Sequence, residues 1–119
     1  MLSGTHRFHG HGSLRYVFKN GQAIRSRFLT VKHTRNSRRR HSRFAVVVSK
    51  KVHKSAVGRN RMRRRIYEIV RGVLGDVATP SDVVIIITSA EVVGMDAKEL
   101  AVHVQELFRL AGLYKASDS

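Results

Sequence analysis

The apolar residues of this chain recur with two periods, and each period predicts one kind of element. The first set, Leu14, Val17 and Phe18, has helical spacing and would share one face of a short helix. Ser13 directly precedes this set, and serine is a residue type that commonly caps helix N-termini. We therefore expect a first helix that begins after Ser13 and ends near Gly21.

The next two apolar stretches have the composition of strands. Residues 23–34 alternate roughly between two sets of side chains, which predicts one strand, or two if the chain breaks between Arg25 and Arg27. Residues 42–50 contain a continuous apolar run, which indicates a strand that is buried on both faces. A short charged segment separates the two stretches, so a hairpin is the simplest connection between them.

An arginine-rich stretch also carries an apolar stripe, which predicts a helix that is charged and yet part of the core. The stripe consists of Met62, Ile66, Ile69, Val70 and Val73. Opposite or beside it on a helical wheel lie Asn60, Arg63, Arg64, Tyr67 and Arg71, with Arg61 and Arg65 along its other flank. We therefore expect the arginines to form an exposed rim around a buried face. Glu68 could pair with Arg64 and Arg65, but one glutamate cannot neutralise the whole cluster.

The remaining apolar segments predict one more strand and a last helix. Residues 83–88, VVIIIT, form a short apolar run that is typical of a buried strand. Asp96 is a candidate N-cap, and Glu99 follows it at the spacing of a capping box. The helix that follows would bury Leu100, Val104, Leu107, Phe108 and Ala111. The order helix, strands, helix, strand, helix indicates a single α+β domain around a central, mostly antiparallel sheet.

Length and composition also fit one domain. The chain has 119 residues, 42% of them hydrophobic, and it has no cysteine, which excludes disulfides and cysteine-ligated zinc. We expect residues 1–12 to form a flexible His/Gly-rich tail, residues 13–115 the domain and residues 116–119 a C-terminal tail. No segment resembles a signal peptide or a membrane span, so we expect a soluble, cytoplasmic protein.

The charge of the chain is divided unevenly along the sequence. The net charge is +15, but residues 1–65 hold 19 Lys or Arg and no acid, whereas residues 66–119 hold 4 Lys or Arg and all 8 acids. A solvated surface usually mixes both signs, so a long acid-free segment points to a polyanionic partner. Nucleic acid is the favoured partner. An anionic membrane is less favoured because no long amphipathic basic helix with exposed aromatic residues is present.

Catalytic chemistry is harder to find in this sequence. Phosphodiester cleavage by a protein needs carboxylates that hold metal ions, or histidines placed as acid and base. His33, His41 and His53 lie in or beside the basic segments, but nothing near them pairs a base with an orienting group. His6, His9 and His11 belong to a run of histidine and glycine that could ligate a metal or could be a disordered tail.

The motif at residues 46–71, VVVSKKVHKSAVGRNRMRRRIYEIVR, resembles the signature of the protein subunit of bacterial ribonuclease P. In that family a strand ending in Ser-Lys-Lys leads through a short loop into a helix that opens with Arg-Asn-Arg. SLRYVFKNG near the start and LAVHVQELFRLAGLY near the end extend the resemblance over nearly the whole chain in the same order.

The resemblance implies which residues bind RNA. Its expected contacts to the catalytic RNA are Arg59, Asn60, Arg61, Arg63, Arg64, Arg65, Lys50 and Lys51. Its expected cleft for the single-stranded 5′ leader of precursor tRNA is lined by Leu14, Phe18, Phe28 and Val31. The sequence departs from the family pattern at several positions: Leu14 stands where Phe is common, Val31 where some members have Tyr, Tyr67 where a basic residue is usual and Arg65 where an apolar residue is usual.

The resemblance also implies a division of labour and a topology. Ribonuclease P removes the 5′ leader of precursor tRNA as a ribonucleoprotein, and Mg²⁺ ions held by its RNA perform the hydrolysis. We accordingly expect one protein per RNA, with no catalytic residue, metal or cofactor in this chain. The family fold contains a left-handed βαβ crossover, whereas the general rule favours the right-handed form.

Two other classes share part of this pattern. A ribosomal-type RNA-binding protein would show the same charge asymmetry. A helix-turn-helix DNA-binding protein would place a basic helix in the major groove, but that motif needs two helices joined by a tight turn. Here a predicted strand directly precedes the basic helix, which argues against the DNA-binding class.

Overall fold

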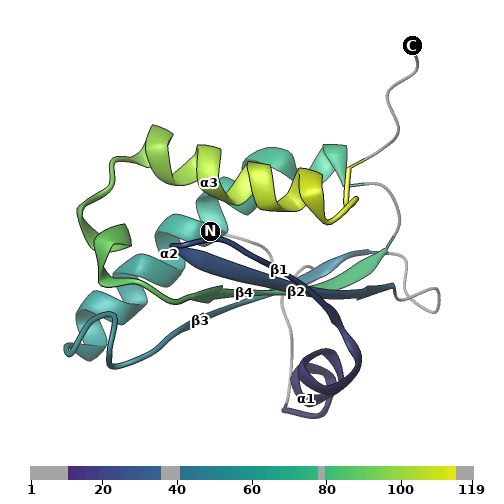
Figure 1. Ribbon diagram of the computed structural model, residues 1–119, viewed down its shortest axis with the longest axis horizontal. Helices are drawn as coiled ribbons and strands as arrows, with labels where there is room; N and C mark the ends of the chain where they lie inside the picture. Colours follow the sequence, from purple (N-terminus) through teal and green to yellow (C-terminus); the bar gives the residue numbers. More distant parts are fainter. Residues whose placement is uncertain (1–10, 36–40, 78–79, 115–119) are drawn as a thin grey trace.

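The computed structural model describes residues 11–35, 41–77 and 80–114 (Figure 1). Its helices and strands are α1 (His11–Asn20), β1 (Gln22–Arg25), β2 (Leu29–Arg35), β3 (Arg43–Val48), α2 (Ala56–Val73), β4 (Ser81–Ile87) and α3 (Ala97–Leu110). Two short 3₁₀ helices, η2 (Leu74–Asp76) and η3 (Ala90–Gly94), follow α2 and β4. The predicted order of elements is confirmed, and the predicted strand over residues 23–34 is divided into β1 and β2.

The four strands form one mixed sheet in the order β1-β2-β4-β3. β1 pairs antiparallel with β2, β2 pairs antiparallel with β4, and β3 pairs parallel with β4. The expected hairpin between the second and third strands is therefore wrong, because β4 lies between β2 and β3. β4 is buried along its length except at the half-buried Ile86, and a strand so apolar is most stable at the centre of a sheet.

β3, α2 and β4 form a parallel βαβ unit, as the resemblance implies. The sheet is mostly antiparallel, as expected. The hand of the crossover stays an expectation from the resemblance.

The helices cover the two faces of the sheet unequally. α2 and α3 lie together on one face, and α1 lies alone on the other (Figure 1). Leu29, Val31 and Ile85 point to the side of α2 and α3 and join its core, whereas the next residues along each strand point to α1. Val17 of α1 is fully buried on that second face.

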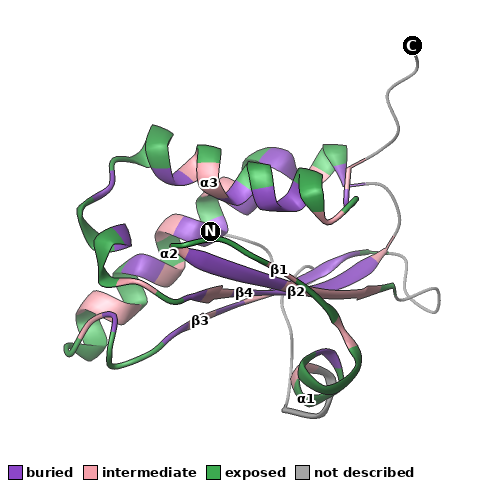
Figure 2. Ribbon diagram, in the orientation of Figure 1, coloured by how far each residue is buried: buried purple, intermediate pink, exposed green. Residues whose placement is uncertain are grey.

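The two long helices begin after side chains that cap them, and of these caps Asp96 is the one predicted from the sequence. Ser55 caps α2 by accepting a hydrogen bond from the backbone N–H of Gly58, and Asp96 caps α3 by accepting one from the N–H of Glu99 (2.8 Å). The predicted apolar residues of α3 are buried apart from Ala111, which is partly buried against the core. Figure 2 shows that both helices bury the faces turned to the sheet and expose the others.

Two local predictions differ from the structure. Tyr67, which the helical wheel places opposite or beside the apolar stripe, is buried, because α2 contacts α3 as well as the sheet and its buried arc is therefore wider than one stripe. α1 begins at His11 rather than after Ser13. Helix ends are fixed by sequence signals only to within one or two residues. The histidines at positions 6 and 9 lie outside the described residues.

Within the ranges that the structure describes, no helix combines the length and the apolar character needed to cross a membrane.

Candidate nucleic-acid interface

The N-terminus of α2 is joined rigidly to the loop that precedes it. The Arg59 guanidinium donates hydrogen bonds through Nη1 to the backbone carbonyls of His53 (3.0 Å) and Lys54 (2.9 Å). The His53 Nδ1 atom accepts a hydrogen bond from the N–H of Ser55 (3.2 Å). The His53 ring also lies so close to Gly58 that a Cβ atom there would come within 2.2 Å of it. The glycine therefore allows the loop to pack against the helix.

Cationic side chains project from this loop and from the first turns of α2. They are exposed and include Lys50, Lys51, Lys54, Arg61 and Arg64, which together we call the basic end of α2. In the part of the chain that the structure describes, none of the five forms an ion pair with an acid. The helix N-terminus contributes a further partial positive charge. This end of the molecule is accordingly a strongly cationic surface.

The other predicted RNA-binding residues make contacts within the protein. Asn60 accepts a hydrogen bond from the guanidinium of Arg63, which is half-buried. Arg65 donates to the backbone carbonyl of Met95 and reaches the sulfur of Met62, so it joins α2 to the segment before α3. Arg65 is therefore placed as a structural contact, in agreement with its position on the flank of the apolar stripe.

Glu68 pairs with Arg71 (3.2 Å), whereas the sequence suggested Arg64 and Arg65 as its partners. Arg71 lies in the last turns of α2, so this carboxylate does not face the basic end of the helix. Glu68, the acid nearest in sequence, thus does not neutralise the cations at the basic end of α2.

A second candidate surface lies on the α1 face of the sheet. Phe18 is 38% exposed, and the ammonium of Lys32 lies 5.0 Å from the centroid of its ring. The same ammonium is 3.5 Å from the backbone carbonyl of Phe18. Lys32 belongs to β2 and shares this face with the half-buried Val47 and Ile86. An aromatic ring, a cation and apolar surface are therefore together here.

Lys32 was not among the residues predicted from the sequence, because Val31, on the other face of β2, was assigned to the leader cleft instead. Val31 was expected in the leader cleft, but it is fully buried in the core between β2 and the two long helices, so this prediction is wrong. Side chains alternate along a strand, so the neighbour of a core residue is the one that faces α1. The signal was present as the alternation of Leu29, Thr30, Val31 and Lys32.

Phe28 and Leu14 are the other two residues of the predicted cleft. The structure places Phe28 away from Leu14 and Phe18. The Phe28 ring lies 4.6 Å from the His103 ring of α3, on the side of the sheet away from α1, so it does not join Phe18. The chain turns between β1 and β2 at this position, and the alternation of the strand does not continue through the turn. Leu14 is half-buried on α1, one turn before Phe18.

The described ranges contain no group of three or more His, Asp or Glu side chains arranged to hold a metal ion. His53 is occupied in packing the loop against α2. Burial lowers the pKa of His33, which lies away from the basic end of α2, at the last pair of β1 and β2.

The fold and these surfaces define an α+β protein with a cationic end, whose five exposed cations form no ion pair within the described ranges. A family model described as Ribonuclease P matches residues 2–112 of the chain. Ribonuclease P protein components of a Pseudanabaena species and a Roseiflexus species are similar to it. The first is 32% identical over 89 residues, covering 75% of this chain and 77% of the relative. The second is 37% identical over 83 residues, covering 70% and 67%.

Solved structures agree with this result at the level of the fold. The ribonuclease P protein of Staphylococcus aureus superposes with a TM-score of 0.82 at 21% identity, covering 92% of this chain and 98% of that one. The protein of Thermotoga maritima gives a TM-score of 0.78 at 24% identity, covering 87% and 96%. The chain belongs to the ribonuclease P protein family. It is thus a protein component of an endoribonuclease ribonucleoprotein whose other part is RNA.

Proposed function

We propose that the basic end of α2 binds the catalytic RNA and that the α1 face holds the single-stranded 5′ leader of precursor tRNA. One protein would act per RNA. Mg²⁺ ions held by the RNA would supply the hydrolytic chemistry, and this chain would supply electrostatic neutralisation and grip on the leader.

The observation that carries this proposal is the exposed, acid-free cluster at the basic end of α2. Like charges close together on a helix and its loop repel one another, so the cluster destabilises the free protein slightly. Phosphate groups relieve that repulsion and release condensed counterions from the RNA, which is the main source of affinity in such complexes. The Arg59 hydrogen bonds to the loop carbonyls support the role, because they fix Lys54 relative to Arg61 before RNA arrives.

The contact between Phe18 and Lys32 supports the leader-binding role of the α1 face. An exposed cation–π contact is worth about 0.5–1 kcal/mol, whereas stacking of a nucleic-acid base on an aromatic ring is worth about 1–3 kcal/mol. A leader base can therefore displace the ammonium from the ring. Lys32 would then be free to pair with a leader phosphate, so the displacement is compensated.

Reconstitution of the holoenzyme tests this function. The purified protein is mixed with its cognate catalytic RNA, and cleavage of precursor tRNA is measured at a low Mg²⁺ concentration where the RNA alone is slow. We expect the protein to accelerate cleavage and the double variant Arg61→Ala, Arg64→Ala to require a higher protein concentration. Arg71→Ala is the matched control, since Arg71 lies at the other end of α2 and pairs with Glu68. No acceleration by the wild-type protein would refute the proposal.

A further inference from the structure

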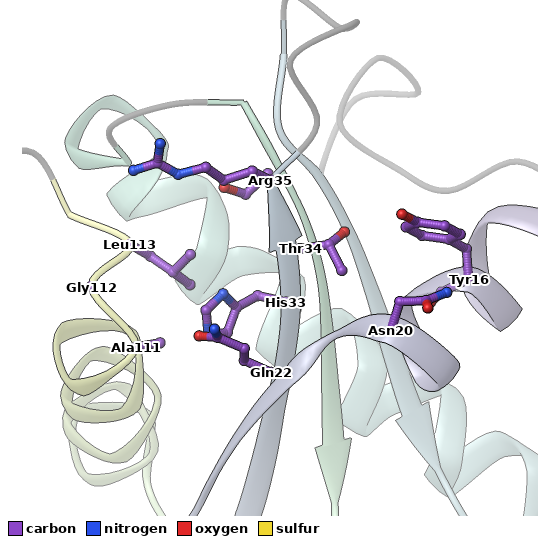
Figure 3. Close-up of a pocket in the computed structure, with 10 residues that line it drawn as sticks. Tyr16, Asn20, Gln22, His33, Thr34, Arg35, Ala111, Gly112 and Leu113 are labelled. Atoms are coloured by element: carbon purple, nitrogen blue, oxygen red, sulfur yellow. The ribbon is translucent and has the colours of Figure 1, made fainter.

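A polar pocket opens at the edge of the sheet, away from the basic end of α2. Its volume is about 480 Å³, within the usual range of ligand sites. The lining residues come from α1, β1, β2, β4 and the end of α3, and are Tyr16, Asn20, Gln22, His33, Thr34, Arg35, Ser81, Ala111, Gly112 and Leu113 (Figure 3).

The pocket exists because β1 is shorter than β2. The pairing of these strands stops at Gln22 and His33, so Thr34 and Arg35 pair only with β4 among the described strands. The chain leaves the sheet at this point to meet α1, and a notch remains at the edge. His33 points toward the end of α3 and Thr34 toward Tyr16, on the two sides of β2 (Figure 3). Both faces of the sheet thus contribute to one opening.

Two hydrogen-bonding atoms in this notch have no partner. The Nε2 atom of His33 and the Oγ1 atom of Thr34 are buried, and neither forms a hydrogen bond with the protein. The great majority of buried polar atoms in folded proteins are satisfied, so two neighbouring exceptions require an explanation. Burial also lowers the pKa of His33, which favours the neutral imidazole, a form that can both donate and accept a hydrogen bond.

The remaining lining side chains suit a nucleotide. Tyr16 is 58% exposed and offers an aromatic ring, while Asn20 and Gln22 offer amides that can read the edge of a base. Arg35 is exposed at the pocket and offers a guanidinium for phosphate. The lining contains no acidic residue. A ligand with a hydrogen-bonding ring and a negative charge matches all of these features.

This pocket is separate from the surface around Phe18. On the α1 helix Tyr16 and Asn20 lie on one flank of the buried Val17, and Phe18 lies on the other flank with Leu14. Asn20 also donates a hydrogen bond to the backbone carbonyl of Tyr16, which holds its amide on the same flank. A nucleotide in the notch would therefore not stack on Phe18.

We propose that this notch binds one nucleotide of a single-stranded RNA segment, with the base against His33 and Thr34 and the phosphate at Arg35. The inference rests on the proposed function in one respect, namely that RNA is the partner of the chain. It adds a binding site at the opposite flank of α1 from the leader surface.

Nuclear magnetic resonance of the isotope-labelled full chain tests the site. Backbone amide shifts are followed while the four nucleoside 5′-monophosphates, and separately inorganic phosphate, are added. We expect saturable shifts at Tyr16, Gln22 and Thr34 with at least one nucleotide, and much weaker shifts there with inorganic phosphate. Equal shifts with phosphate alone would reduce the notch to an anion site and overturn the proposal, as would the absence of saturable shifts.

A pair of matched variants separates binding from folding. Thr34→Val removes a hydroxyl that is unused in the free protein, so the melting temperature should stay the same or rise. Nucleotide affinity should fall about 2- to 10-fold, the loss expected for one hydrogen bond. Thr30→Val is the control, because Thr30 is buried on the same strand and the same face but lies outside the pocket. Its nucleotide affinity should not change.

The outcome is independent of the test of the proposed function. If Thr34→Val and Thr30→Val bind nucleotides equally well, the notch is not a nucleotide site, even when the wild-type protein still accelerates precursor cleavage. If the protein fails to accelerate cleavage but nucleotides still bind in the notch and depend on Thr34, the proposed function fails and the site remains.

Discussion

At the scale of single residues, the ring of Phe18 is a sharper candidate for leader binding than the sequence alone could indicate. A phenylalanine one turn after Leu14 could equally belong to the core. The structure leaves 38% of the surface of Phe18 exposed and places Val17, not Phe18, in the fully buried position. Part of Phe18 is therefore accessible to RNA.

Phe18→Ala should weaken binding of precursor tRNA to the holoenzyme by about 1–3 kcal/mol, because a base loses its stacking partner. Binding of mature tRNA, which lacks the leader, should be nearly unchanged. The measurement compares both affinities and the melting curve of the variant. A fall of about 3–5 kcal/mol in the free energy of unfolding, typical of a truncated core phenylalanine, with equal losses for both tRNAs, would return Phe18 to the core.

The ion pair between Arg43 and Asp82 is a residue-scale feature of stability. Two hydrogen bonds, of 2.9 and 2.7 Å, join the guanidinium to the carboxylate across β3 and β4. Both side chains are almost fully buried, with 7% and 6% of their surfaces exposed. Burial makes such a pair expensive to break, since the remaining charge keeps its desolvation cost.

Asp82→Ala should lower the free energy of unfolding by about 3–5 kcal/mol, as measured by chemical denaturation. Glu106→Gln is the control, because Glu106 pairs with Arg109 on the exposed surface of α3 and should show no measurable change. Equal stability of Asp82→Ala and the wild-type protein would mean that the buried pair contributes nothing to folding.

At the scale of elements, α2 combines two kinds of arginine that the sequence presents as one motif. Arg61 is exposed and has no acid partner in the described ranges, whereas Arg59 is half-buried and donates to the two carbonyls of the preceding loop. The first is placed to meet phosphate. The second is placed to hold the loop that carries Lys50 and Lys51.

Arg61→Ala should flatten the dependence of RNA affinity on salt by about one unit of log–log slope per lost phosphate contact, with an unchanged melting temperature. Arg59→Ala should weaken RNA binding while also increasing hydrogen exchange in residues 49–55, because the loop loses two hydrogen bonds. Binding at several salt concentrations and exchange of the free protein check both statements. If hydrogen exchange in residues 49–55 is unchanged in Arg59→Ala, Arg59 does not hold the loop and its role is to bind RNA phosphate alone.

The type of each element could be predicted from the sequence, but the pairing of the strands could not. Helical and strand periods identify α2, β4 and α3, and the Asp96 cap fixes the start of α3 within a residue. Local patterns favour a hairpin between neighbouring strands, yet β4 inserts between β2 and β3 because a strand buried on both faces belongs at the centre.

The candidate site shows the same limit. The basic residues of α2 could be found from composition, since charge segregation is visible without a fold. The leader surface depends on which side of β2 faces α1, and an error of one residue exchanges Val31 for Lys32. The notch at the sheet edge depends on where β1 stops pairing, which no local pattern indicates.

At the scale of the whole molecule, basic and acidic residues are separated along the sequence and therefore lie mostly on different elements. The acid-free residues 1–65 build α1, β1, β2, β3 and the first turns of α2, whereas the acids lie in the later elements. α1 and the basic end of α2 belong to the same acid-free part of the sequence. Long-range attraction of RNA should therefore involve this part of the molecule, and salt should screen it strongly.

That arrangement predicts how the protein affects catalysis. The free chain with Mg²⁺ should not cleave precursor tRNA, because the proposal places the catalytic metal ions in RNA. Added to the catalytic RNA, the chain should lower the Mg²⁺ concentration needed for half-maximal cleavage, since its cations replace counterions at RNA phosphates.

Raising monovalent salt should remove this advantage before it unfolds the protein, because phosphate contacts are screened while buried packing is not. Cleavage rates across a Mg²⁺ series, at two salt concentrations and with circular dichroism of the protein in parallel, provide the measurement. Cleavage by the RNA-free chain at a rate near that of the holoenzyme would place the chemistry in the protein and refute the division of labour.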